Sequence, residues 1–285
     1  MTIRTILAEV TGNAADETVL DSALQVAERH GAHIRVLHVK HDMIDPVWDA
    51  GMVDYGPIID VLQQEAKKRE STARRRFEDW RKRHRLAEKA EPPAAKRPTV
   101  SFIAQSGIAR GLLTDEGRVS DLTIMLRPEI APADTSAEFE TSLFDTGRPV
   151  LLVSGKSTAD LHTHVMVAWD GSLEAARAVA LAMPLLEEAE KVSVYTGGDQ
   201  PSARSGKPAA DLVKHLAWHG IKTGIAATNP KADSIGADLL DSCRKAKATM
   251  LVMGAYHHSR LRQVVLGGVT RHVLANAKLP LLLTH

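Results

Sequence analysis

Apolar runs alternate with amphipathic stretches through the second half of the chain. The apolar runs predict strands at 165–169, 192–195, 221–227, 250–253 and 279–284. The stretches between them predict helices at 173–188, 209–218, 234–246 and 269–277. Short apolar runs with little polar alternation are typical of parallel strands covered by helices on both faces. The alternation of strands with helices therefore predicts an α/β fold with right-handed crossovers.

The first half repeats this order of elements. A strand at 3–10 precedes the turn Thr11-Gly12-Asn13, where Asn13 is expected to be the helix N-cap and Asp16 to be the N3 residue. By pattern, 34–39 matches 191–195, 122–126 matches 249–253, and 148–153 matches 279–284. Internal repetition at about half the chain length predicts two tandem doubly wound domains built on one plan.

The predicted domains span 1–154 and 160–285. The boundary falls in Ser154-Gly155-Lys156-Ser157-Thr158, whose polar composition is typical of flexible linkers. The first domain carries an insertion at about 41–98. This insertion holds a predicted helix at about 58–86 and a proline-rich segment, 91–98, that cannot continue a helix.

The inserted helix is strongly basic. Acidic and basic residues are nevertheless interleaved in it, and three pairs have the i,i+4 spacing that stabilises a solvated helix face: Glu65→Arg69, Glu70→Arg74 and Glu78→Lys82. We therefore interpret the helix as a solvated element, with recruitment of an anionic partner as the alternative.

Length and composition narrow the class of protein. A chain of 285 residues is long for one compact core and suits two domains. The single cysteine, Cys243, excludes an internal disulfide and fits a reducing compartment. A net charge of +1 gives the whole molecule no attraction to nucleic acid, which we do not expect as a partner. No apolar run approaches the roughly 20 residues that cross a bilayer, and no signal-peptide pattern opens the sequence. We expect a cytoplasmic protein without a membrane partner.

Two segments of the second half carry candidate chemistry. Ala168-Trp169-Asp170-Gly171-Ser172 ends a strand and opens a helix, with Ser172 as the expected N-cap. The run 254–270 contains three glycines that let a backbone approach a ligand closely: Gly254, Gly267 and Gly268. Together the two segments resemble the universal stress protein family, and the resemblance covers nearly the whole chain as two repeats.

The resemblance implies that ATP or another adenine nucleotide, with Mg²⁺, binds the second domain. In that family an aspartate after the first strand and a loop spaced G-x2-G-x9-G-(S/T) hold ATP. The loop departs from the pattern here, because His257 replaces the second glycine and Gly268 replaces the hydroxyl residue. The cofactor-binding candidates are Ala168, Asp170, Tyr195, Gly254, His257, Arg260, Gly267, Gly268, Val269 and Thr270. The resemblance also implies a five-stranded parallel sheet of order 3-2-1-4-5 in each domain, with helices on both faces.

The corresponding site in the first half is expected to be lost. Thr11 stands where Asp170 stands, and Arg127-Pro128-Glu129 is matched with Gly254-Ala255-Tyr256. The loop that follows is acidic and would repel a triphosphate. We interpret the first domain as a structural partner that keeps the fold.

The last strand of each domain is an apolar edge. Such an edge invites pairing, so 150–153 is expected to pair with 281–284. The family's members often pair in this way, and the fused domains would then form a pseudo-twofold dimer inside one chain. Further oligomerisation stays open.

These patterns predict a stress-response protein that binds an adenine nucleotide weakly or vestigially and acts by binding rather than turnover. No nucleophile elbow or complete Walker loop is present, so no catalytic residue is identified and any ATP hydrolysis is expected to be slow. No metal site is predicted, because His215 and His219 lack the glutamate of a zinc helix. The alternative is a scaffold, without nucleotide, that recruits a protein or anionic partner.

Overall fold

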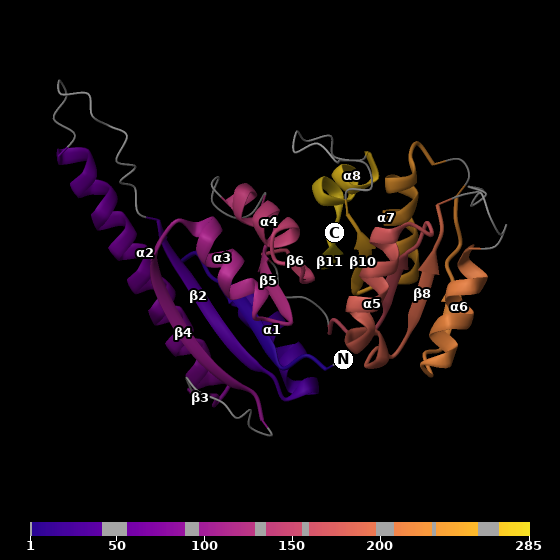
Figure 1. Ribbon diagram of the computed structural model, residues 1–285, viewed down its shortest axis with the longest axis horizontal. Coiled ribbons are helices and arrows are strands. Elements are labelled where there is room, and N and C mark those ends of the chain that lie inside the picture. Colours follow the sequence, from indigo (N-terminus) through magenta and orange to yellow (C-terminus); the bar gives the residue numbers. More distant parts are fainter. Residues whose placement is uncertain are drawn as a thin grey trace.

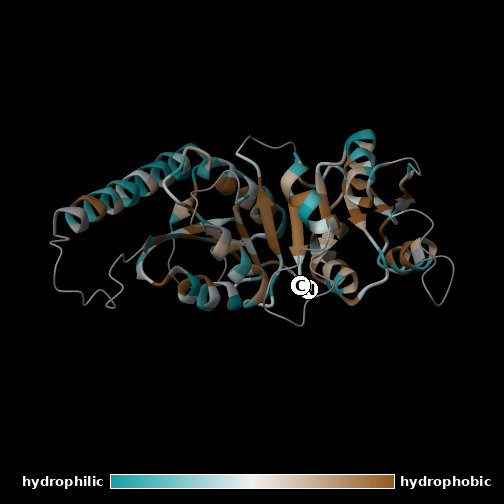
Figure 2. Ribbon diagram, turned by 90° about the horizontal axis from the view of Figure 1, so that it is seen from above, coloured by the Kyte–Doolittle hydropathy of each residue, from teal (hydrophilic) through white to brown (hydrophobic). Residues whose placement is uncertain are grey.

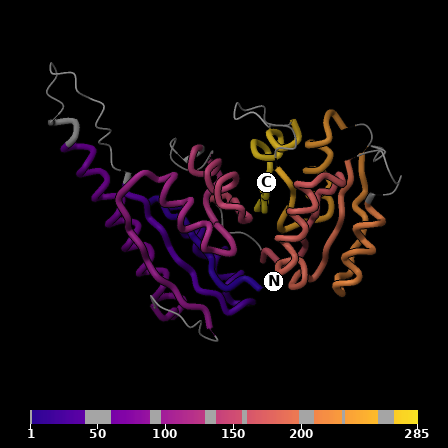
Figure 3. Tube along the Cα trace, viewed as in Figure 1, coloured from indigo at the N-terminus to yellow at the C-terminus, as the bar shows by residue number. Residues whose placement is uncertain are grey.

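The computed structural model describes residues 2–41, 56–88, 97–128, 135–155, 160–197, 208–229, 232–255 and 268–285. These residues form one eleven-stranded sheet of order β3-β4-β2-β1-β5-β6-β11-β10-β7-β8-β9. We call the part with β1–β6 the first half and the part with β7–β11 the second half; Figure 1 shows them side by side. The Cα trace in Figure 3 shows the same division.

The first half contains ten elements, namely β1 (Thr5–Glu9), α1 (Asp16–His30), β2 (His33–His41), α2 (Gly56–Arg83), β3 (Ala87–Glu88), β4 (Thr99–Gly107), α3 (Ala109–Arg118), β5 (Leu122–Leu126), α4 (Thr135–Phe144) and β6 (Val150–Val153). The second half contains nine, namely β7 (Val165–Ala168), α5 (Leu173–Glu187), β8 (Val192–Tyr195), α6 (Pro208–Trp218), β9 (Thr223–Ile225), α7 (Ile235–Ala246), β10 (Met250–Gly254), α8 (Gly268–Asn276) and β11 (Leu281–Thr284).

Each half has the doubly wound order that the sequence predicts. The five main strands run β4-β2-β1-β5-β6 in the first half and β9-β8-β7-β10-β11 in the second, all parallel within their half. The first half adds one short strand, β3, beside β4. Helices α1, α2, α5 and α6 contribute to the core on one face of the sheet, and α4, α7 and α8 to the core on the other. In each half, the neighbouring strands β1 and β5, or β7 and β10, mark the point where the chain changes direction across the sheet.

The two halves join through their last strands. β6 and β11 pair antiparallel, with Leu152 opposite Leu281 and Leu151 opposite Leu282. All four side chains are fully buried, and Figure 2 shows this central strand pair as hydrophobic. The predicted pairing of 150–153 with 281–284 is confirmed. One core cluster runs from the first half into the second, so the joint is a shared core as well as a shared sheet.

The basic helix α2 is less solvated than its charges suggest. Ala73, Phe77 and Trp80 are buried against the sheet, and the Trp80 indole Nε1 donates to Asp21 Oδ1 at 2.8 Å. The predicted i,i+4 partners were wrong in two pairs. Glu70 pairs with Lys40 at 3.4 Å and Glu78 with Arg81 at 2.8 Å. Glu70 reaches a lysine of strand β2, whereas Glu78 pairs with an arginine three residues further along the same helix.

Helix α1 begins later than predicted. Its N-cap residue is Ala15, which makes no side-chain cap, so Asn13 is not the N-cap and Asp16 is not at N3. The Asn13 side chain instead accepts from the Ala15 N–H at 3.1 Å. The physical reason is that the Asp16 carboxylate turns back toward the β1 end. In α5 the prediction holds, since Ser172 Oγ accepts from the Ala175 N–H at 3.1 Å.

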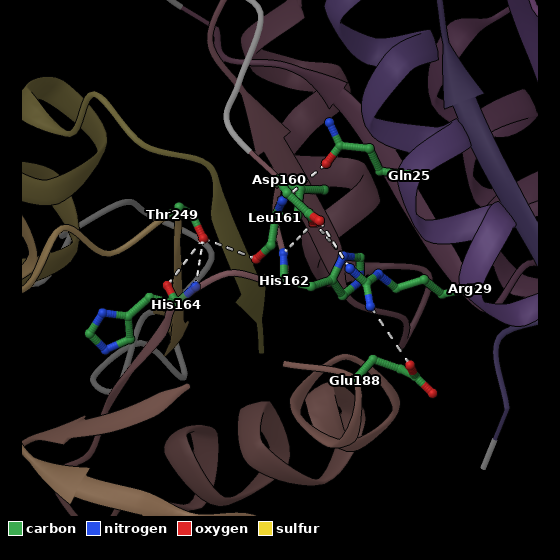
Figure 4. Close-up of polar contacts among 8 residues, drawn as sticks. All are labelled: Gln25, Arg29, Asp160, Leu161, His162, His164, Glu188 and Thr249. Atoms are coloured by element: carbon green, nitrogen blue, oxygen red, sulfur yellow. Dashed lines mark hydrogen bonds and ion pairs between the residues drawn. The ribbon is translucent and has the colours of Figure 1, made fainter. Parts of the chain in front are cut away.

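A polar cluster joins α1 to the segment before β7. Arg29 donates to Asp160 at 2.9 Å, Asp160 lies 3.1 Å from the His162 ring, and Gln25 accepts the Leu161 N–H at 3.0 Å. Figure 4 shows these side chains around the fully buried His162. Burial lowers the pKa of His162, so the ring is neutral at neutral pH. These contacts cross the predicted domain boundary and tie the halves together at a second place.

Among the helices that the structure describes, none has both the length and the apolar character needed to span a bilayer.

Candidate functional site

The second half presents a polar turn at the carboxyl end of β7. Asp170 is exposed, and its Oδ1 accepts the Ser172 N–H at 2.9 Å. Gly171 has a φ of +78°, a left-handed conformation that favours glycine. Within the described part of the chain, the backbone N–H groups of Asp170 and Gly171 have no acceptor. The turn therefore presents an exposed carboxylate and two backbone donors that have no acceptor among the described residues.

Gly254 ends β10 next to this turn. A Cβ atom there would lie 2.5 Å from the carbonyl carbon of Glu174 and 2.7 Å from the nitrogen of Ala175. No side chain fits at that separation, so glycine is needed for β10 to pack against the first turn of α5. The role of Gly254 is thus at least partly one of packing. This close packing brings the β10 end beside the β7 turn at the switch point of the sheet.

Helix α8 begins at Gly268. Gly268 is exposed and a Cβ atom there would meet nothing within 4 Å. Val269 packs against the core, and Thr270 is buried. The surface that α8 offers at its described start is therefore the backbone of these residues, at the positive end of the helix dipole. His257, Arg260 and Gly267 lie outside the described residues.

Two further candidates are placed by the core. Ala168 is partly buried at the end of β7. The Tyr195 side chain is buried, and its hydroxyl donates to Asp238 Oδ2 at 2.9 Å. Burial and this carboxylate raise the pKa of Tyr195 well above its ordinary value. The Tyr195 carbonyl accepts the Trp169 N–H at 2.8 Å, so neither its hydroxyl nor its carbonyl is free of protein partners.

Two polar side chains near the candidate residues, Trp169 and Asp238, were not among the sequence-based candidates. The Trp169 indole Nε1 is buried without a hydrogen-bond partner among the described residues, and a buried donor of this kind normally has an acceptor. The sequence pointed to Trp169 only through its position, because it directly precedes the candidate Asp170. Asp238 gave a weaker signal, as an acidic residue in the first turn of α7.

The first half can be aligned with the second by its hydrogen bonds. Val10 N–H donates to the Leu37 carbonyl at 2.9 Å, as Trp169 N–H donates to Tyr195. Thr11 therefore corresponds to Asp170, as predicted. The same register makes Asp16 the counterpart of Ala175.

Asp16 closes the turn of the first half. Its carboxylate accepts the N–H of Thr11 at 3.0 Å and of Gly12 at 2.7 Å, and the Thr11 hydroxyl at 3.2 Å. These amides are the counterparts of the two free donors at Asp170 and Gly171. Burial raises the pKa of Asp16 to about 6, although these hydrogen bonds and the nearby Arg76 act to lower it. The first half thus satisfies with its own carboxylate the groups that the second half leaves open.

A leucine stands where the second half has Gly254. Leu126 pairs with Val153 at the end of β5, as Gly254 pairs with Thr284 at the end of β10. The sequence-based match of Arg127 with Gly254 was therefore wrong by one residue. The error arose because two apolar runs of similar length can be aligned in either register without their hydrogen bonds.

Helix α2 also approaches the turn after β1 in the first half. A Cβ atom at Gly12 would lie 2.9 Å from the Arg69 carbonyl oxygen, and Gly12 itself has a φ of +83°. The buried Glu9 occupies the position of Ala168 at the end of β1. Backbone, carboxylates and an inserted helix therefore lie close around the turn of the first half.

Taken together, the strand order and the switch-point turn define a pair of doubly wound α/β units. The model of the universal stress protein family matches residues 2–105 and 162–285. The chain belongs to the universal stress protein family.

Solved structures agree with the fold. A universal stress protein from Archaeoglobus fulgidus has 16% sequence identity and a TM-score of 0.70, over 99% of this chain and 96% of that one. A functionally unknown protein from Pseudomonas aeruginosa has 13% identity and a TM-score of 0.55, over 99% and 92%. No curated protein matches the chain. At these identities the structural likeness concerns the fold alone.

Proposed function

We propose that this stress-family protein binds an adenine nucleotide at the carboxyl edge of its second half, weakly, and acts by binding rather than turnover. One observation carries the proposal. Among the described residues, the amides of Asp170 and Gly171 have no acceptor and lie beside an exposed carboxylate, whereas the matching amides in the first half donate to Asp16. In the first half the Asp16 carboxylate occupies the turn amides. In the second half the matching amides can therefore bind an acceptor group of a ligand.

The surrounding residues fit such a ligand. The exposed Asp170 carboxylate suits the hydroxyls of a ribose, and the first turn of α8 at Gly268 suits a phosphate through its N–H groups and dipole. His257, Arg260 and Gly267 complete the proposed site by sequence. Mg²⁺ would arrive with ATP, since the described residues contain no cluster of three side chains that would hold a metal.

The experiment is calorimetric titration of the full chain with ATP, ADP and AMP in the presence of Mg²⁺. We expect binding of at least one nucleotide, and we expect Asp170→Ala to weaken it at least about tenfold, which corresponds to about 1.4 kcal/mol. The matched control is Thr11→Ala, which removes the side chain at the same position of the first half. Equal binding by wild type and Asp170→Ala would refute the assignment, as would a larger effect of Thr11→Ala.

A scaffold function is the second candidate, and α2 favours it. Lys68, Arg75 and Lys82 recur every seven residues along the helix and are exposed. They form no ion pair with any described residue. A surface of this kind suits an anionic partner, protein or otherwise. Failure of all three nucleotides to bind would favour this candidate. In either case we propose the cytoplasm as the compartment, since the only cysteine is unpaired and buried.

A further inference from the structure

Arg127 links the two halves at the end of β5. Its side chain is buried, and its guanidinium donates through Nη1 to the Ala277 carbonyl and through Nη2 to the Leu279 carbonyl, the latter at 3.0 Å. Its own N–H donates to Val153 at 3.0 Å. A residue of the first half therefore contacts the backbone of the second through two charge-assisted hydrogen bonds.

The sheet explains how Arg127 reaches this backbone. Because β6 and β11 run antiparallel, the end of β6 lies beside the start of β11. The Arg127 N–H is hydrogen-bonded to the carbonyl of Val153, the last residue of β6. Leu279 lies two residues before β11. The joint between the halves thus places the arginine against the segment that connects α8 to β11.

The two accepting carbonyls follow the end of α8. The Ala277 N–H donates to the Val273 carbonyl at 2.9 Å, which closes the last turn of the helix. Carbonyls at a helix C-terminus lack partners within the helix and carry the negative end of its dipole. A guanidinium has a rigid fork of donors and a permanent positive charge, so it can donate at once to the Ala277 carbonyl at the helix end and to the Leu279 carbonyl beyond it.

Anchoring one end of α8 affects the other end. The described part of the helix, nine residues, is short enough to move as one rigid rod. Its second anchor is close packing on α7, where a Cβ atom at Gly236 would lie 2.9 Å from the His272 Cβ. The amides of its first turn, at Gly268 and Val269, are therefore placed by contacts at the middle and the far end of the helix.

The second half has no equivalent of Arg127 at the matching position. Ala255 N–H donates to Thr284 as Arg127 N–H donates to Val153, so Ala255 holds the equivalent position in the second half. An alanine side chain has no donor. The half with the closed turn thus supplies the anchor, and the half with the open turn receives it.

We propose that Arg127 is a positioning residue through which the first half fixes α8 and, with it, the phosphate end of the nucleotide site. This inference rests on the proposed function for its ligand, but not for the mechanical contact. It gives the first half a role beyond keeping the fold, because a half that binds no nucleotide sets the affinity of the half that does.

The test compares Arg127→Gln with a matched control, Arg148→Gln. Arg148 also donates from its guanidinium to a carbonyl at a helix end, that of Arg118 at 3.3 Å, but within the first half. Two measurements are made on each full-length variant: amide hydrogen exchange of residues 270–273 without ligand, and titration with Mg²⁺ and ATP. Circular dichroism verifies that each variant is folded.

We expect faster exchange in α8 and at least about fivefold weaker ATP binding in Arg127→Gln, the lower end of typical coupling between sites. Arg148→Gln should change neither by more than about twofold. Arg127→Lys keeps the charge but not the fork, and should give intermediate values; it decides the question if Arg127→Gln does not fold. Unchanged α8 exchange in a folded Arg127 variant would overturn the proposal.

The two measurements also separate this inference from the proposed function. If wild-type protein binds no nucleotide, the proposed function fails, and the exchange comparison alone decides whether Arg127 holds α8. If wild type binds ATP and Arg127→Gln binds it equally while α8 exchanges faster, the link from α8 to the ligand is refuted.

Discussion

The carboxyl ends of β1 and β7 show how one turn can be closed or open. Both turns carry a glycine with positive φ, at Gly12 and Gly171. In the first half the turn amides bind Asp16, and in the second half the corresponding residue is Ala175. The backbone creates the same demand for an acceptor in both halves. The side chain five residues after the first of these amides decides whether a carboxylate of the same half accepts them.

A second position strengthens the contrast. Gly254 lets the first turn of α5 approach β10, while Leu126 fills the corresponding place with a buried side chain. The two halves therefore share a fold but differ at the turn after their first strand. One half has an accessible turn, and the other half has replaced accessibility with packing and with contacts to its neighbour.

The largest expected effect concerns the strand pair that the halves share. Leu152→Lys together with Leu282→Lys would place charges in the cores on both faces of the sheet, since the two side chains point to opposite faces. Burying unpaired charges should cost more than about 4 kcal/mol and unfold both halves together. Chemical denaturation monitored by circular dichroism measures this loss.

The control for the strand pair is Ile225→Lys in the outer strand β9. Ile225 is 61% exposed, so lysine there should change stability by less than about 0.5 kcal/mol. If the central double variant unfolded in two separate transitions, with one half unaffected, the halves would not form the single body described above.

The next effect comes from placing alanine at the end of β5 or of β10. Leu126→Ala should cost about 2–5 kcal/mol, because it removes a buried side chain. It should not create a nucleotide site, because Asp16 still holds the turn. Gly254→Ala should cost about 1–3 kcal/mol through overpacking against Glu174, and it should weaken nucleotide binding. Denaturation and titration on the same samples test both parts, and a neutral Gly254→Ala would contradict the close packing.

A pH-dependent effect isolates Asp16. Its pKa is raised from 3.8 to about 6, chiefly by burial. The folded state therefore holds the proton more tightly than the unfolded state. The stability that Asp16 contributes is fully present below pH 3.8 and is lost as the pH rises through about 6. At about 1.4 kcal/mol per pH unit, the change is on the order of 3 kcal/mol.

Asp16→Ala introduces the residue of the second half and removes this titration. The stability of wild type relative to Asp16→Ala should fall between pH 4 and pH 7, as measured by urea denaturation at each pH. Arg76→Gln should move the midpoint upward, since Arg76 lowers the pKa of Asp16. A difference between wild type and Asp16→Ala that stayed constant with pH would show that Asp16 keeps an ordinary pKa.

The sequence was sufficient for the architecture because periodicity reports burial directly. The runs 150–153 and 281–284 are apolar at every position except Thr284, and both prove to be central strands buried on both faces. The N-cap at Ser172 was also predictable, since its hydroxyl has a local acceptor role. Asp170, Gly254 and Gly268 could be proposed from the sequence because a turn, a close approach and a helix start each leave a local pattern, but their role toward a ligand stays a prediction.

Contacts between distant segments were not predictable from the sequence. The Asp16 carboxylate looked like an ordinary first-turn residue until its backward hydrogen bonds were known. Arg127 was assigned to the wrong position because register depends on strand pairing. The partners of α2 likewise depend on the sheet beneath it, as Lys40 shows for Glu70. In each case the deciding contact is absent from the local pattern.

The smallest expected effect tests whether the exposed side of α2, which has no counterpart in the second half, contributes to the fold. Arg75→Glu with Lys82→Glu should change stability by less than about 0.5 kcal/mol per site, because both residues are exposed and form no ion pair with a described residue. Arg76→Glu is the contrasting variant. Arg76 is partly buried and acts on Asp16, so a negative charge there should raise the pKa of Asp16 further and destabilise the first half at neutral pH. Thermal denaturation compares the two variants, with ATP titration to show that neither changes the second half.

A large loss of stability in the Arg75 and Lys82 variant would mean that the exposed side of α2 stabilises the fold. Salt-dependent binding of an anionic polymer that this variant abolished would instead establish the scaffold function.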